Sequence, residues 1–305
     1  MAVTALMVKE LRERTGAGMM DCKNVLEETD GDIERGIELL REKGLAKAAK
    51  KAGRVASEGL VRISFSPDGK KTAMAEVNSE TDFVAKNADF IGFVEHVAAM
   101  TLEAEDENVE NFMTLQFKNE GTVQEVLSHK ISTIGENLHV RRLYKANTPG
   151  CVYVGYIHGN GKIGVIIGLK TEASVEEVTV VGKDVAMQVA SMNPKFIDET
   201  SIDPEYLESE KKILIQQALN EGKPANIVEK MVTGRLKKEL KETCLVEQKF
   251  VKNSDMSVEE YVESVAKEIG KPIQVVEMVR FEVGEGVEKK EENFAEEVAK
   301  QMSAV

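Results

Sequence analysis

The sequence predicts an α+β fold, because the spacing of its apolar residues changes along the chain. Up to Gly44 these residues recur at helical spacing, whereas from Leu60 they alternate with polar ones as in half-buried strands. The order hairpin, helix, strand then occurs twice. At 305 residues, with 42% hydrophobic and 30% charged residues, the chain is expected to form two or more globular units.

Residues 1–54 are predicted to form a three-helix module with a linker. Thr4 can cap the first helix, in which Leu6 is expected to face a core together with other apolar residues. The third helix is expected to stop at Gly44, since glycine readily adopts the left-handed conformation that ends many helices. The Ala/Lys-rich stretch that follows would then tether the module.

The core is predicted to consist of two related subdomains, residues 55–148 and residues 149–198 with 244–284. Two local matches occur at one offset: Gly69-Lys70 with Gly161-Lys162, and Val97–Met100 with Val189–Met192. Residues 199–243 interrupt the second copy and read as an antiparallel helical hairpin that starts at Asp203-Pro204. Its apolar stripe can pack on its own domain, or it can pair chains into a homodimer or a 2:2 complex with a partner.

The connection Asn78–Asn87 is the strongest candidate for a functional site. It joins a predicted strand to a predicted helix, and Phe83 stands at its centre, where polar residues are usual. One interpretation makes Phe83 an aromatic anchor for a partner protein. The other makes Phe83 and Val84 local core beneath the loop, and the residue types alone do not separate the two.

Composition disfavours several classes of function. The net charge of −13, the absence of Trp and 5% aromatic residues disfavour nucleic-acid binding. No apolar run is long enough for a membrane span and no signal peptide is recognised, so a cytoplasmic location is expected. Three distant cysteines without a CxxC pair favour free thiols: Cys22, Cys151 and Cys244. The basic residues near Lys47 are more typical of a solvated helix face than of a binding patch.

No motif for covalent chemistry is found, so an enzyme, a metal site and a cofactor are not expected. The histidines lack metal-ligand spacing, and both a G-x-S-x-G elbow and a phosphate-binding loop are missing. Gly284–Gly286 is a lone GxG that is typical of a turn. His158, at the tip of the second predicted hairpin, is a candidate contact with a partner.

Four segments carry a resemblance to a known family: Thr15–Lys23, Asn78–Asn87, Gly135–Asn137 with Arg141-Arg142, and Arg280–Gly286. In these segments the chain closely resembles the elongation factor Ts family, the nucleotide-exchange factors of elongation factor Tu. The similarity covers nearly the whole chain, although the acidic stretch Glu103–Glu110 matches the family poorly. The resemblance implies a ubiquitin-associated-like N-terminal module and a short C-terminal helical module at residues 285–305.

The resemblance also implies a function and a set of contacts. The chain would bind elongation factor Tu with GDP and promote GDP release by disturbing its Mg²⁺ and phosphate site, without binding nucleotide itself. The loop expected to enter near the Mg²⁺ comprises Thr81, Asp82, Phe83 and Val84. Asp82 would either position Phe83 or repel the acidic metal ligands. Further expected contacts are Met19, Met20, Asp21, Lys23, Lys51 and His158.

Two rival functions belong to other classes. A structural or chaperone-like binder would use the helical hairpin and never contact a GTPase. A nucleotide-using enzyme is disfavoured by the missing phosphate loop. If exchange is the function, removing Tyr206 to Glu242 is expected to spare much of it.

Overall fold

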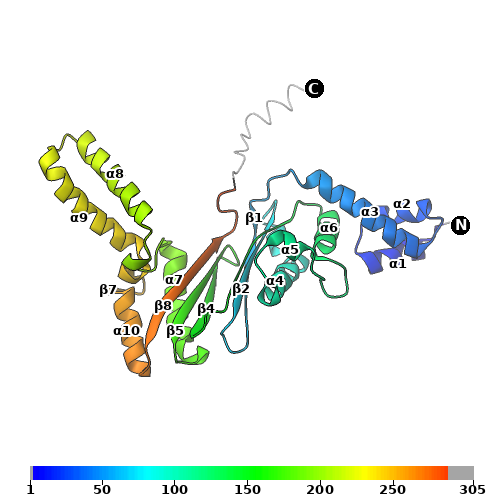
Figure 1. Cartoon of the computed structure of the whole chain (residues 1–305). Coiled ribbons are helices and arrows are strands. Elements are labelled where there is room, and N and C mark those ends of the chain that lie inside the picture. Colours follow the sequence, from blue (N-terminus) through cyan, green and yellow to red (C-terminus); the bar gives the residue numbers. More distant parts are fainter. Residues whose placement is uncertain (1–2, 288–305) are drawn as a thin grey trace. The chain divides into compact units, whose positions relative to one another are not determined.

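The computed structural model describes residues 3–287 and has the expected α+β character (Figure 1). The chain divides into two compact units. The first comprises Met1–Val61, Ala75–Tyr144 and Glu282–Val305, and the second comprises Arg62–Met74 and Lys145–Phe281. Most of the C-terminal module expected at residues 285–305 lies outside the described residues, and the five-part division of the chain stays a prediction.

Three helices begin the first unit: α1 (Ala5–Thr15), α2 (Met19–Glu28) and α3 (Ile33–Lys51). Thr4 caps α1 as expected, since its hydroxyl accepts a hydrogen bond from the Met7 amide. The prediction for Leu6 is wrong, because its side chain is 78% exposed. Val8 and Leu11 share the buried face of α1, and Leu6 lies about 200° around the helix from Val8.

Gly44 does not end α3, which continues to Lys51. The following Leu-Ala-Lys-Ala-Ala-Lys-Lys run consists of strong helix formers, which outweigh the cost of one glycine. Gly44 is buried, and a Cβ placed on it would lie 3.6 Å from the Ser132 Cβ of α6 (Val123–Ile134). A Cβ at this distance would make an ordinary van der Waals contact, so the packing of α3 on α6 does not require a glycine here. The expected tether is part of a packed helix.

A three-stranded sheet in the order β1-β2-β3 follows. Its strands are β1 (Glu58–Phe65), β2 (Thr72–Ser79) and β3 (His139–Ala146). Between β2 and β3 come the short 3₁₀ helix η1 (Val84–Lys86), α4 (Ala88–Glu103), α5 (Val109–Met113) and α6. Helix α5 is not predicted from the sequence, and it contributes the buried side chain of Phe112 to the core formed by α4, α6 and the sheet.

The second unit contains a sheet of the same connectivity, in the order β4-β5-β8. Its strands are β4 (Cys151–His158), β5 (Ile163–Thr171) and β8 (Ile273–Glu282), and its core helix is α7 (Val175–Met192). Strands β4 and β5 pair antiparallel, with Val154 opposite Ile167. The sequence analysis missed a small ribbon and helix before β8: β6 (Lys249–Phe250), β7 (Asn253–Ser257) and α10 (Val258–Ile269).

The helical hairpin also belongs to the second unit. It consists of α8 (Pro204–Asn220) and α9 (Ala225–Thr243), flanked by the 3₁₀ helices η2 (Glu199–Ser201) and η3 (Leu245–Glu247). Asp203 caps α8, and Pro204 occupies its first turn, as expected. The apolar stripe of α9 packs on α8, forming a cluster separate from the core of the sheet: Leu214, Ala218, Val228 and Val232.

Candidate functional site

The loop between β2 and α4 places Phe83 and Val84 in opposite environments. Phe83 is 79% exposed, whereas Val84 is buried in the core of the first unit. The loop ends at Asn87, whose side chain caps α4 by accepting a hydrogen bond from the Asp89 amide at 2.8 Å. The interpretation as local core therefore fits Val84, and exposure leaves the Phe83 ring available to another molecule.

Two carboxylates hold the start of this loop against the residues that follow α6. Glu136 accepts hydrogen bonds from the backbone amide of Thr81 at 2.9 Å and from its hydroxyl at 2.6 Å. In the opposite direction, Glu80 accepts a hydrogen bond from the Asn137 amide at 2.6 Å. These four residues (Glu80, Thr81, Glu136 and Asn137) form a reciprocal pairing that we call the clamp.

The C-terminal end of α3 joins the clamp. The Lys51 ammonium group donates a hydrogen bond to the carbonyl oxygen of Gly135, and the Asn137 side chain donates one to the Arg54 carbonyl at 2.8 Å. The Arg54 guanidinium lies 3.5 Å from the Glu80 carboxylate. Lys51, expected to contact a partner, thus has a partner within its own chain.

Asp82 and Lys86 flank Phe83 on the loop. The Lys86 ammonium lies 2.6 Å from an Asp82 carboxylate oxygen and 5.6 Å from the centre of the Phe83 ring. An ammonium at this distance is attracted by the negative face of an aromatic ring. The pair therefore restricts the directions in which the exposed ring can point.

The other expected contacts of the N-terminal module lie on α2. Met19 and Met20 are 58% and 63% exposed, which is unusual for adjacent large apolar side chains. Asp21 accepts a hydrogen bond from Lys47 at 2.9 Å, and Lys23 lies 3.7 Å from Glu27. The two methionines are thus the side chains of this group that present uncovered apolar surface.

His158 ends β4 in the second unit and is exposed. Its Nδ1 lies 2.9 Å from the Tyr156 hydroxyl, so the tyrosine holds the ring. The described residues 3–287 contain no group of three or more His, Cys, Asp or Glu side chains that could hold a metal ion. No helix in the described part of the chain is long and apolar enough to cross a membrane.

Arg141, Arg142 and the turn at Gly284, all within the first unit, meet around Glu76, a fully buried carboxylate on β2. One Glu76 oxygen, Oε1, accepts hydrogen bonds from Arg141 at 3.0 Å and from the Gly284 amide at 2.9 Å. The other oxygen, Oε2, accepts one from the Arg142 Nε. Gly284 has a φ of +73°, and a Cβ there would lie 2.1 Å from the Ser57 carbonyl oxygen. The lone GxG motif is therefore a structural turn, as its sequence suggested.

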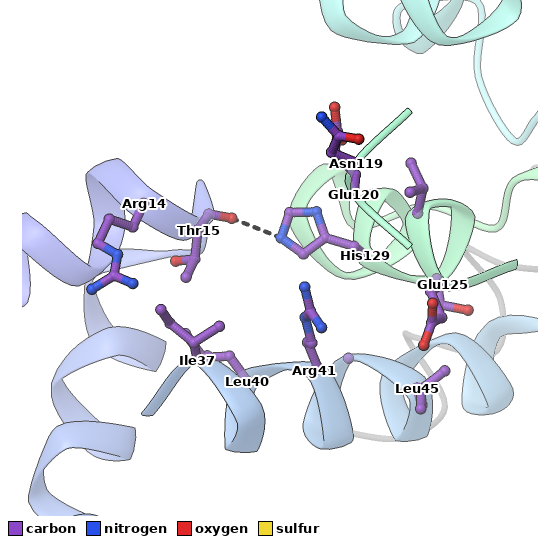
Figure 2. Close-up of a pocket in the computed structure, with 13 residues that line it drawn as sticks. Arg14, Thr15, Ile37, Leu40, Arg41, Leu45, Asn119, Glu120, Glu125 and His129 are labelled. Atoms are coloured by element: carbon purple, nitrogen blue, oxygen red, sulfur yellow. Dashed lines mark hydrogen bonds between the residues drawn. The ribbon is translucent and has the colours of Figure 1, made fainter. Parts of the chain in front are cut away.

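A second candidate is a cleft of about 310 Å³ lined by α1, α3, α6 and residues 119–120 (Figure 2). Across it, the His129 Nε2 lies 2.7 Å from the Thr15 carbonyl oxygen, and Arg41 reaches in from α3. Its only histidine contacts a backbone oxygen, and its lining includes no cysteine. The hydroxyl of Ser128, which also lines the cleft, donates to the Gln124 carbonyl and not to His129. Two glutamates share the lining with His129, but they do not form with it a group that could hold a metal ion.

Sequence reasoning did not single out Glu80, Glu136 and Asn137 as functional residues. All three lie within segments that carry the family resemblance, and this resemblance is the sequence signal that could have identified them. Their pairing joins residues 55 and 57 positions apart, which the sequence does not reveal.

An exposed aromatic side chain on a loop held at both ends is typical of a protein that acts by binding another protein. A profile of the family described as "Elongation factor TS" matches residues 80–285. The chain is 59% identical over 300 residues to "Elongation factor Ts" of Clostridioides difficile (strain 630), covering 98% of this chain and 99% of that protein. It is 54% identical over 298 residues to "Elongation factor Ts" of Clostridium perfringens (strain SM101 / Type A), with 98% of each chain covered. The chain belongs to the elongation factor Ts family.

Proposed function

We propose that this chain binds elongation factor Tu in its GDP-bound form and accelerates GDP release during translation elongation. Membership of the elongation factor Ts family implies the role of nucleotide exchange. The observation that carries the mechanism is the 79% exposure of Phe83 on a loop fixed by the clamp on one side and by buried Val84 on the other. No covalent chemistry by this chain is required.

The mechanism is displacement rather than competition for the nucleotide. A GTPase holds GDP through its phosphates and through Mg²⁺, a hard cation that needs nearly ideal octahedral oxygen geometry. Phe83 acts as an apolar wedge that moves the elements arranging the ion, so the nucleotide is held less tightly. By linkage, bound nucleotide weakens the binding of the exchange factor by the same factor, which lets incoming GTP expel it.

The role of Asp82 in this mechanism is to position Phe83. Its carboxylate lies 2.6 Å from the Lys86 ammonium, so its negative charge is partly neutralised within the loop. A neutralised carboxylate repels acidic metal ligands weakly, whereas the Lys86 contact with the ring restricts Phe83. The contacts therefore support the positioning role over the repulsive one.

Three other surfaces complete the proposal. Met19 and Met20 offer an apolar docking surface on the N-terminal module, and His158 offers a polar contact with another domain of the partner. The helical hairpin is the surface for self-association, giving a homodimer or a 2:2 complex. Its exposed apolar side chains support that role: Ile213, Leu219 and Ile227.

Stopped-flow release of a fluorescent GDP from purified elongation factor Tu tests the function. We expect the release rate to rise with the concentration of this chain and then to saturate. Binding without acceleration would favour the chaperone-like alternative. Direct binding of the fluorescent nucleotide to the isolated chain would favour a nucleotide-using enzyme.

A further inference from the structure

The clamp is a device of the fold that the wedge mechanism does not by itself require. An exposed aromatic residue on a mobile loop would occupy many orientations, and only a fraction of them would fit a partner. A binding-competent state that is only partly populated weakens apparent affinity or slows the step that follows docking. Contacts that fix the loop before docking therefore increase the fraction of productive encounters.

Thr81, which belongs to the clamp, lies two residues before Phe83, and its backbone amide is one of the hydrogen-bonded groups. Glu136 binds both the amide and the hydroxyl of Thr81, which fixes the direction in which the chain leaves β2. The Ser79 hydroxyl donates to the Thr81 carbonyl at 3.0 Å, so the peptide groups on both sides of Thr81 are held. After Phe83, the chain is fixed again by the burial of Val84.

Glu136 itself is held by its neighbours rather than by Phe83. The residues on both sides of Glu136 are held by hydrogen bonds. The Gly135 carbonyl oxygen accepts one from the Lys51 ammonium, and the Asn137 amide donates one to the Glu80 carboxylate. Gly135 directly follows the last residue of α6 and adopts the left-handed conformation, with a φ of 90°. This conformation ends the helix and directs residues 136 and 137 towards the loop. The end of a packed helix is a rigid support for a positioning side chain.

We propose that Glu136 is a positioning residue for exchange: it holds Thr81 so that Phe83 is presented in one orientation to the GTPase. This inference rests on the proposed function and deepens it, since it assigns a role to a residue two positions after α6. Glu136 acts through Thr81 and Phe83 and does not itself need to touch the nucleotide site.

The first test compares saturating exchange rates of Glu136→Ala, Glu136→Gln and the wild type, with elongation factor Tu carrying fluorescent GDP. We expect Glu136→Ala to lower kcat about 10–100-fold, the scale on which misplacement by about 1 Å acts. The KM is expected to change little, because the methionine surface of α2 still docks. Glu136→Gln, which keeps one carbonyl acceptor, is expected to lie between the two.

Thr81 provides a matched pair of variants on the other side of the contact. Thr81→Val removes the hydroxyl donor with little change of shape, and Thr81→Ser keeps it. We expect Thr81→Val to lower kcat, and Thr81→Ser, which keeps the hydroxyl donor, to lower it less than Thr81→Val does. Thr81→Val also answers the case in which Glu136→Ala does not fold, as judged by circular dichroism and thermal unfolding.

The decisive comparison repeats Glu136→Ala and Thr81→Val in a Phe83→Ala background. If the clamp acts through Phe83, neither change lowers kcat further there, because no wedge remains to be positioned. An undiminished loss would instead mean that Glu136 contacts the partner directly or only supports the fold, and it would overturn the inference. If Phe83→Ala is slow while both single clamp variants keep the wild-type kcat, the clamp inference is wrong and the proposed function stands. Wild-type exchange by Phe83→Ala overturns the clamp inference and the wedge mechanism, whereas the exchange function itself stands.

Discussion

Replacing Phe83 by alanine removes the side chain on which the proposed mechanism depends, and the structure sets the size of the effect. Aromatic side chains bury roughly 150–250 Å² in an interface. With 79% of the Phe83 side chain exposed, about 120–200 Å² is available for burial, worth about 3–5 kcal/mol as an upper limit. Ordering and polar desolvation reduce this value, so a loss of at least about 2 kcal/mol is expected, or about 30-fold in the exchange rate.

The assay is stopped-flow release of fluorescent GDP from elongation factor Tu at low concentrations of the exchange factor, where the rate reports kcat/KM. Because Phe83 is mostly exposed, Phe83→Ala should unfold at the same urea concentration as the wild type. Val180→Ala is the matched control, since Val180 is a 67% exposed apolar residue on α7 that has no role in the proposal. A folded Phe83→Ala variant with a rate within about threefold of the wild type would contradict the reasoning, because a hot-spot truncation costs more than that.

Four further predictions concern stability and the remaining elements. Glu76→Ala leaves two arginines without their buried partner and should lower the free energy of unfolding, measured by urea titration, by about 3–5 kcal/mol. Gly44→Ala should stabilise the protein by about 0.4–1 kcal/mol, because a Cβ fits beside Ser132, whereas Gly16→Ala should lower the melting temperature, because φ is +66° there. Burial raises the pKa of Cys244 to about 11, so few of its thiols are ionised at pH 8, and alkylation followed by mass spectrometry should label Cys244 slowly. Replacing residues 209–239 by a Gly-Gly turn should preserve most exchange activity, since the hairpin has its own apolar cluster.

Each of these predictions has an outcome that would contradict it. A loss below about 1 kcal/mol for Glu76→Ala would mean that its ion pairs with Arg141 and Arg142 stabilise the fold no more than an exposed ion pair does. Glu285→Ala, which removes the more exposed ion pair with Arg142, is the control for that comparison. Destabilisation by Gly44→Ala would mean that the packing of α3 against Ser132 leaves no room for a Cβ. Complete loss of exchange in a folded hairpin deletion would assign the hairpin an essential role.

The pKa of Cys244 also fixes the direction of a pH effect. Its folded-state pKa is raised above the ordinary 9.0, so the neutral thiol is the form that the folded protein favours. The corresponding stability is complete below pH 9 and is lost as the pH rises towards about 11. Rapid alkylation of native protein at pH 8 would contradict the burial of this thiol.

Local sequence signals predicted most of the secondary structure. Asp203-Pro204 starts α8, and the second predicted hairpin forms as β4 and β5. These signals work because caps, turns and hydrophobic periodicity act over a few residues. The failures have different causes. Strong helix formers after Gly44 continue α3, and α5 has only five residues. Helix α10 has a clear local signal that was overlooked, a capping box formed by Ser257 and Glu260.

The sequence by itself determined the α+β class, the repeated hairpin–helix–strand order and the loop in which the candidate site lies. It left Phe83 and Val84 with two equivalent interpretations. Only the tertiary structure separated them, because burial depends on which face of the loop meets the core of α4, α6 and the sheet. The clamp likewise required the fold, since Glu136 and Thr81 are 55 residues apart and a contact at that separation is set by packing rather than by local propensity.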